Sequence, residues 1–236
     1  MREFKITEDY YNTGVLFKKS TITIQPGLTV LVGCNGTGKT TLLNHIKDKL
    51  NKDKIPCYHY NNLKDGGTAK ANEYMSKGKI EAVSTLLTSS EGENINNNLY
   101  YMAEDIGSFV RHGKSEADRS FDLFAELIIG SNSKSDTTKD KGKNERWILL
   151  DAIDSGFSID NVIELKDFLH MIVNDGKKTG IDIYIVTVAN EYELAANEQC
   201  LDVYNGEYRT FESYEEYKEF VLDSRKIKDE RIKMWK

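Results

Sequence analysis

The sequence predicts an α/β fold built around a mainly parallel sheet. Two short apolar runs, 147–150 and 181–188, have the composition of strands buried on both faces. Between them, apolar residues recur at helical spacing over 162–172, which is typical of a βαβ unit. A third apolar run, 28–32, is followed at once by a helical pattern over 42–50. These observations together favour strands joined through helices.

The two ends of the chain predict antiparallel elements. Residues 15–24 alternate and are rich in β-branched side chains, and Pro26-Gly27 then turns the chain, so we expect an N-terminal antiparallel β element. Residues 55–60 indicate a further short strand. Residues 201–211 resemble a hairpin that turns at Asn205-Gly206. A C-terminal helix and basic tail are expected over about 213–236.

The middle of the chain predicts an insertion into one domain, because 236 residues are close to the upper limit for a single core. Residues 61–130 are expected to form a helical insertion lobe, with short mobile helices up to residue 98 and helical spacing over 99–110 and 121–129. The polar residues 131–144 bury nothing, so we expect a flexible loop.

Composition limits the compartment and the partners. Apolar runs stay well below the roughly 18 residues that cross a bilayer, and the first residues do not resemble a signal segment, so we expect a cytoplasmic protein without a membrane segment. Three cysteines far apart fit a reducing compartment. A net charge of −6 disfavours a surface dominated by nucleic-acid contacts. The basic tail, 224–236, is read as a solvated helix end, with an acidic partner as the alternative.

A phosphate-binding loop is the most specific motif. Residues 33–40 match G-x-x-x-x-G-K-[ST], directly after one expected strand and directly before one expected helix. Several backbone N–H groups can then face one polyphosphate, and Lys39 can reach the β and γ phosphates. We expect ATP and Mg²⁺ as ligands, with Thr40 on the metal. The residues expected to bind the nucleotide here are Asn35, Gly36, Thr37, Gly38, Lys39, Thr40 and Thr41.

Magnesium on a triphosphate needs a second anchor, and Asp151 at the end of a neighbouring buried strand is the candidate. The stretch ILLDAIDSGFSID, 148–160, resembles the Walker B and D-loop segment of ABC-type ATPases, in particular the chromosome-maintenance and recombination-repair branch. GLTVLVGCNGTGKTTLL, 27–43, resembles the same branch. The middle and the C-terminal third of the chain match that branch only in outline. It implies a P-loop NTPase fold with an ABC-type core sheet, and a homodimer that sandwiches ATP.

Departures from that family concern catalysis. The family places a glutamate after the Walker B aspartate to polarise the attacking water, and this chain has Ala152 there. Lys39 and Asp151 remain candidate catalytic residues for ATP hydrolysis. Asp154 is the nearest other carboxylate and a weaker candidate, with a turn residue as the alternative. Hydrolysis is therefore expected either to be slow or to use another group.

The remaining family positions have only partial counterparts. Gly113 and Ser115 lie in a segment similar to the family's signature motif, with a helix cap as the alternative and 89–93 as a rival segment. In place of the family's switch histidine this chain offers Thr187 and Asn190, and Asn190 could bind phosphate or water or serve as a turn residue. Tyr11, or its neighbour Tyr10, is a candidate for stacking on adenine, with an exposed tyrosine as the alternative.

Three functions remain open at this stage. The first is an ABC-type ATPase that couples ATP-dependent dimerisation to an unknown protein or nucleic-acid partner, in DNA repair or phage defence. The second is a nucleotide-gated regulatory module with little or no hydrolysis, which the alanine at 152 favours. The third is a P-loop kinase, which predicts a basic lid and a monomer.

Overall fold

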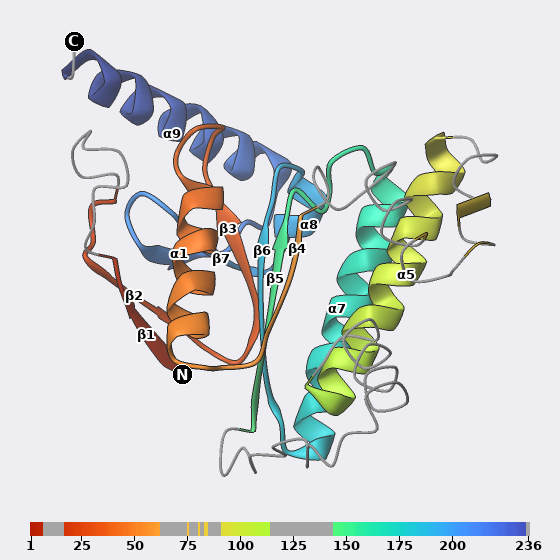
Figure 1. Cartoon of the computed structure of the whole chain (residues 1–236). Coiled ribbons are helices and arrows are strands. Elements are labelled where there is room, and N and C mark those ends of the chain that lie inside the picture. The colour runs from red at the N-terminus through yellow and green to blue at the C-terminus, as the bar shows by residue number, and fades with distance from the viewer. Residues whose placement is uncertain are drawn as a thin grey trace.

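A computed structural model describes residues 1–6, 17–61, 75, 80, 83–84, 91–113 and 144–234. Within these ranges, a six-stranded mixed sheet runs through the centre with the strand order β4-β5-β6-β3-β7-β8, and β1 and β2 form a separate two-stranded sheet. Figure 1 shows α1 on one side of the central sheet and the pair α5 and α7 on the other. The predicted α/β class is confirmed.

The strands and helices have the following bounds. The strands are β1 (Arg2–Lys5), β2 (Thr21–Ile24), β3 (Gly27–Val32), β4 (Cys57–Asn61), β5 (Glu145–Asp151), β6 (Asp182–Val188), β7 (Gln199–Asp202) and β8 (Glu207–Arg209). The helices are α1 (Lys39–Lys52), α5 (Glu91–His112), α7 (Ile159–Thr179), α8 (Tyr192–Ala195) and α9 (Tyr214–Met234).

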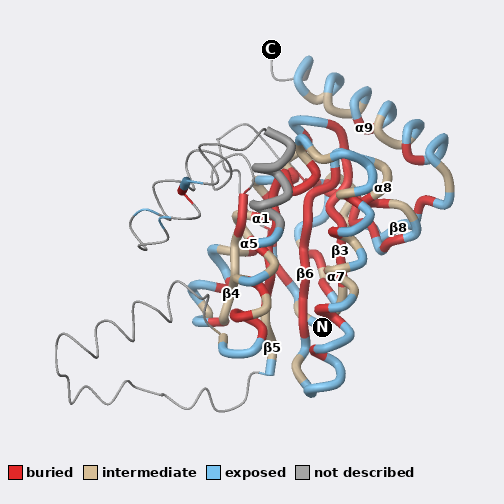
Figure 2. The backbone as a smooth tube through the Cα atoms, turned by 90° about the vertical axis from the view of Figure 1, so that its right-hand side faces the viewer, coloured by how far each residue is buried: buried red, intermediate tan, exposed pale blue. Residues whose placement is uncertain are grey.

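The central strands bury both faces, as their uninterrupted apolar sequences predicted. Ile148 and Leu150 of β5 pack with the helices α5 and α7, whereas Trp147 and Leu149 pack on the side of α1. Successive side chains of a strand point to opposite faces, so one apolar run supplies both cores. Figure 2 shows the result as a buried column through β3 and β6.

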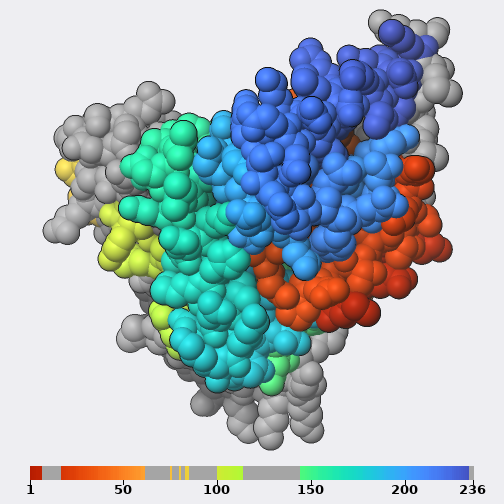
Figure 3. Space-filling view, turned by 180° about the vertical axis from the view of Figure 1, so that it is seen from behind, coloured from red at the N-terminus to blue at the C-terminus, as the bar shows by residue number. Residues whose placement is uncertain are grey.

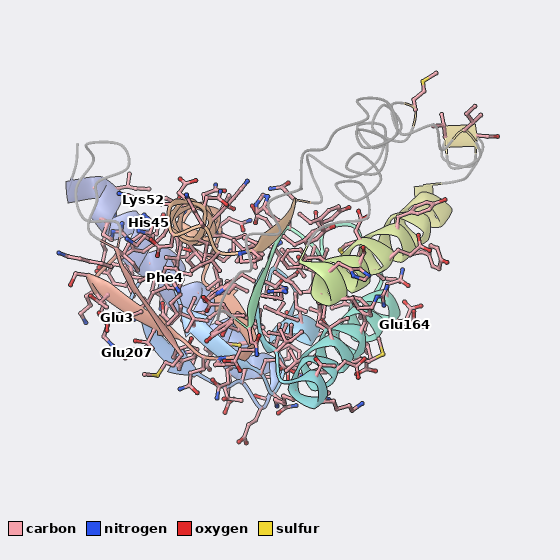
Figure 4. All side chains as sticks on the ribbon, turned by 60° about the horizontal axis from the view of Figure 1, so that its bottom comes forward. Glu3, Phe4, His45, Lys52, Glu164 and Glu207 are labelled. Carbon is pink, nitrogen blue, oxygen red and sulfur yellow. The ribbon has the colours of Figure 1, made fainter. Side chains whose placement is uncertain are left out.

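The N-terminal β element differs in detail from the prediction. β2 pairs antiparallel with β1, whereas β3 lies between β6 and β7 in the central sheet. The turn at Pro26-Gly27 therefore leads from one sheet into another. The small sheet covers α1: Phe4 lies in the same apolar cluster as Leu42 and Leu43, and His45 contacts the carbonyl oxygen of Lys5 at 3.0 Å (Figure 4).

Helix α5, within the expected insertion, belongs to the core. Helix α5 begins at Glu91, eight residues before the predicted helical spacing, and Met102, Ile106 and Phe109 are buried against α7. The other helices expected in this lobe, most of the loop 131–144 and the segment 121–129 lie outside the described residues. Among the described residues, none of the helices combines the length and apolarity needed to cross a membrane.

The C-terminal segments follow the prediction and extend it. β7 and β8 form the expected antiparallel hairpin around Asn205-Gly206, and the expected C-terminal helix is α9, which continues through the basic tail to Met234. The first half of α9 packs on the body through Phe220, Val221 and the buried Tyr217. Seen from behind, the end of α9 projects beyond the rest of the molecule (Figure 3).

Candidate functional site

The loop 33–40 connects the end of β3 to the start of α1, at the edge of the sheet where the parallel strands end. Gly33, Gly36 and Gly38 have φ angles of 146°, 83° and 98°, which side chains rarely adopt. A Cβ on Gly33 would lie 2.7 Å from the hydroxyl oxygen of Thr37. That hydroxyl donates to the carbonyl oxygen of Cys34 at 2.8 Å and closes the loop. The glycines therefore permit a tight turn.

The first turn of α1 faces this loop without a capping side chain. Gly38 is the N-cap residue, no side chain caps the helix, and the first turn contains no acidic residue. The first N–H groups of a helix have no partner within the helix, and they favour an anion. Thr41 lies half-buried in this turn. The local geometry is therefore suited to phosphate.

Lys39 carries a buried cation at the centre of the loop. Its side chain is 7% exposed, and its ammonium donates to the carbonyl oxygens of Gly33 at 2.7 Å and Cys34 at 3.4 Å. It forms no ion pair with a described residue. Burial lowers the pKa of Lys39 below its usual 10.5, an effect that nearby acidic groups, Cys34 foremost, partly oppose. A negatively charged ligand would therefore stabilise the charged form of Lys39.

Asp151 lies beside the loop although its strand is not adjacent to β3. The sequence predicted that the strand before Asp151 lies next to the strand before the loop. This prediction is wrong, because β6 lies between β3 and β5. The Thr40 hydroxyl still donates to Asp151 Oδ1 at 3.2 Å. Asn61 donates its amide to the other oxygen, Oδ2, at 2.9 Å. Two oxygen ligands suitable for magnesium thus meet at the end of β5.

Asn61 is a site residue that the sequence reasoning missed. It is buried at the end of β4, and the parallel register places it directly beside Asp151. The available signal was its position as the last residue of a short strand. That signal requires knowing which strand pairs with β5, and the sequence alone does not supply the strand order.

Asp154 links the segment after β5 to the segment after β6 through hydrogen bonds. It is 1% exposed, and its carboxylate accepts hydrogen bonds from the main-chain N–H groups of Asn190 and Glu191 and from the Asn190 side-chain amide. These bonds occupy both oxygens of a candidate base. Ala152, at the position of the family's glutamate, is buried and has a φ of 52°, so the chain turns sharply directly after Asp151.

Helix α9 lies against the loop from the other side. The Cys34 N–H donates to the buried Ser224 hydroxyl oxygen at 3.1 Å, and the Lys228 ammonium donates to the Asn35 carbonyl oxygen at 3.1 Å. A cleft of about 650 Å³ opens between the loop, the residues that follow β6, and α9. The basic tail was read from the sequence as a solvated helix end, yet its first residues adjoin the loop.

The structure brings some of the expected residues together and leaves others apart. Lys39, Thr40 and Asp151 converge, and Asn190 lines the same cleft as Lys39. Gly113 ends α5, and a Cβ there would lie 3.4 Å from the Arg146 guanidinium, at the edge where β5 begins. Gly113 therefore lies near the amino ends of the parallel strands, whereas Asp151 lies at their carboxyl ends. The candidates Tyr11 and Ser115 lie outside the described residues.

No family model and no curated protein matches this chain.

Proposed function

We propose that this protein binds ATP with Mg²⁺ through the loop 33–40. The observation that carries the proposal is the Lys39 ammonium, which is buried among backbone groups with neutral carbonyl oxygens as its hydrogen-bond acceptors. A desolvated cation without an ion pair is costly. The β and γ phosphates of ATP would supply the missing negative charge while the open N–H groups of α1 bind the same chain of phosphates.

Thr40 and Asp151 would hold the metal. Both present oxygen atoms, which suit Mg²⁺, and the 3.2 Å contact between them is the place where a metal and its water ligands would enter. Asn61 fixes Asp151 Oδ2 and leaves Oδ1 directed at Thr40. The bound ion would supply charge neutralisation at the phosphates, while these side chains orient it.

Within that nucleotide-binding role, the leading proposal is an ABC-type ATPase that dimerises around ATP and acts on an unknown protein or nucleic-acid partner. Water attack on the γ phosphate needs a group that orients the water. The alanine at 152 has no polar atom for this purpose, and Asp154 is bound to Asn190 and Glu191. These two observations favour a second candidate, a nucleotide-gated binding module with very slow turnover.

One further alternative gains support from α9. A P-loop kinase would place a basic lid beside the phosphates, and Lys218, Arg225 and Lys228 line the cleft beside the loop. The kinase differs from the leading proposal in oligomeric state. Light scattering on adding ATP and Mg²⁺ separates them: a monomer that becomes a dimer supports the ABC-type ATPase, and a persistent monomer supports the kinase.

Substitution of Lys39 tests nucleotide binding. We expect Lys39→Ala to abolish detectable binding of a fluorescent ATP analogue. Lys49→Ala, which removes an exposed lysine from the same helix, should leave binding unchanged. Single-turnover release of phosphate then distinguishes the two leading candidates: release above the Lys39→Ala background supports the ATPase, and release equal to it supports the module. Equal ATP binding by both variants would refute the proposal.

A further inference from the structure

The cleft beside the loop 33–40 has a cationic wall on α9. Lys218, Arg225 and Lys228 line it from the helix, and Lys39 lines it from the loop. Among the described residues, Glu191 is the one acidic residue in the lining. Its volume of about 650 Å³ lies within the range of small-molecule sites. The cleft is therefore suited to an anionic group.

The charges of α9 are divided between its faces. The cleft-lining residues Lys218, Arg225 and Lys228 are seven and three positions apart, which places them along one side of a helix. None of the acidic residues of α9 lines the cleft. These acidic residues are Glu215, Glu216, Glu219, Asp223, Asp229 and Glu230. Lys218 and Arg225 form no ion pair with a described residue, so their charges are available to a ligand.

Lys228 lies directly on the loop. Its ammonium donates to the Asn35 carbonyl oxygen at 3.1 Å, and a Cβ on Gly36 would meet the Lys228 side chain at 3.5 Å. The buried contact between Ser224 and the Cys34 N–H fixes α9 in this register. Lys228 also lies 3.9 Å from Asp229 Oδ1, at the outer limit of an ion pair, so its close acceptor is the neutral Asn35 carbonyl oxygen. A phosphate oxygen would pair the ammonium with an opposite charge and form a stronger bond.

The direction of a bound nucleotide follows from Lys39. In a loop of this sequence the lysine reaches the β and γ phosphates, and the cleft opens at Lys39 and at the first half of the loop, Gly33 to Asn35. The terminal phosphate therefore faces α9. Resting on the proposed nucleotide binding, we propose that Lys228 and Arg225 bind the γ phosphate within the same chain, so that α9 distinguishes a triphosphate from a diphosphate.

Calorimetry on the full chain tests this assignment. The probes are the non-hydrolysable triphosphate adenylyl imidodiphosphate and ADP, each with Mg²⁺. Lys228→Met and Arg225→Met should each weaken triphosphate affinity by roughly tenfold or more and ADP affinity by less than about threefold. Lys228→Arg should retain most of the affinity because it keeps the charge.

Lys226→Met is the matched control, because Lys226 is 74% exposed on the same helix and pairs with Asp223 at 2.8 Å. It should change neither affinity. Unchanged triphosphate affinity in the Lys228 and Arg225 variants, or equal losses for both nucleotides, would overturn the role of α9 and leave the proposed function standing. A wild-type protein that binds neither nucleotide would overturn both proposals. Circular dichroism shows whether each variant is folded.

Discussion

Asp154 accepts two hydrogen bonds from Asn190, one from its main-chain N–H at 2.5 Å and one from its side-chain amide at 2.9 Å. The Glu191 N–H adds a third at 2.8 Å. The segment after β5 is thereby joined to the segment after β6, on the side of the sheet that carries the loop 33–40. Asp154 therefore positions the site, and its buried carboxylate is held by three hydrogen-bond donors.

Replacing Asp154 should destabilise the fold. Asp154→Ala leaves two main-chain donors without their acceptor, and we expect a loss of roughly 2–4 kcal/mol in the free energy of unfolding. Guanidinium denaturation measures this quantity. Asp167→Ala, on the exposed face of α7, should change it by less than about 0.5 kcal/mol. Equal stability of the two variants would contradict the positioning role.

Two helical glycines should respond to alanine with opposite signs. A Cβ on Gly176 of α7 would lie 2.2 Å from the Ile183 side chain and 2.9 Å from the Ile181 carbonyl oxygen, so Gly176→Ala forces α7 away from β6. On Gly107 of α5 the nearest atom would be the flexible end of Arg111 at 3.5 Å.

We expect Gly176→Ala to lower the free energy of unfolding by at least about 1–3 kcal/mol. Gly107→Ala should raise it by up to about 1 kcal/mol, because alanine favours the helix. Thermal or denaturant unfolding gives both values. A stabilising Gly176→Ala would show that α7 and β6 are less closely packed than the structure describes.

The metal contribution to nucleotide affinity should depend on Asp151 and its partner. Asp151→Asn keeps the volume and removes the charge, so Mg²⁺ should no longer strengthen ATP binding, a loss of roughly tenfold or more. With a chelator present and Mg²⁺ removed, the ATP affinity of Asp151→Asn should be nearly the same as that of the wild-type protein. Asn61→Ala removes the hydrogen bond to Asp151 Oδ2 and should reduce the magnesium-dependent gain in ATP affinity by a smaller factor. An undiminished magnesium effect in Asp151→Asn would exclude this carboxylate as an anchor.

A glutamate at position 152 should restore water activation if nucleotide binds as proposed. Ala152→Glu places a carboxylate directly after Asp151, and general-base catalysis contributes about 10²- to 10⁴-fold in rate. Phosphate release under single-turnover conditions measures the gain. Lys39→Ala in the same background is the control and should remove it. A folded, ATP-binding Ala152→Glu variant with no faster release would show that the missing carboxylate does not limit turnover.

ATP affinity should fall at alkaline pH. In the free protein burial holds the pKa of Lys39 below 10.5, and a neighbouring phosphate favours the charged form and raises it again. Binding therefore takes up a proton in the window between the two pKa values, and the dissociation constant rises with pH there. Calorimetry at pH values that rise to about 10.5, in two buffers of different ionisation enthalpy, measures this uptake. A pH-independent affinity over that range would contradict the buried-cation assignment.

Local patterns predicted the strands and helices well. The buried strand at 147–150, the hairpin at Asn205-Gly206 and the helix after the loop 33–40 each depend on residues close in sequence. The strand order depends on the whole chain, so the placement of β6 between β3 and β5 and the pairing of β2 with β1 were beyond reach of local patterns.

The same limit applies to the site. Residues 33–40 and Asp151 are recognisable because their motifs are local. The contact of Asn61 with Asp151 spans 90 positions, and that of Lys228 with Asn35 spans 193, so both arise from the tertiary arrangement. The basic residues of the tail 224–236 were visible in the sequence, but nothing local to that helix indicated which structure it faces.

Titration of the purified full chain with ATP in a calorimeter, with and without Mg²⁺, measures whether the loop 33–40 binds the nucleotide and its metal. We expect saturable heat that strengthens with magnesium and disappears in Lys39→Ala. No magnesium-dependent heat from the folded wild-type protein would contradict it.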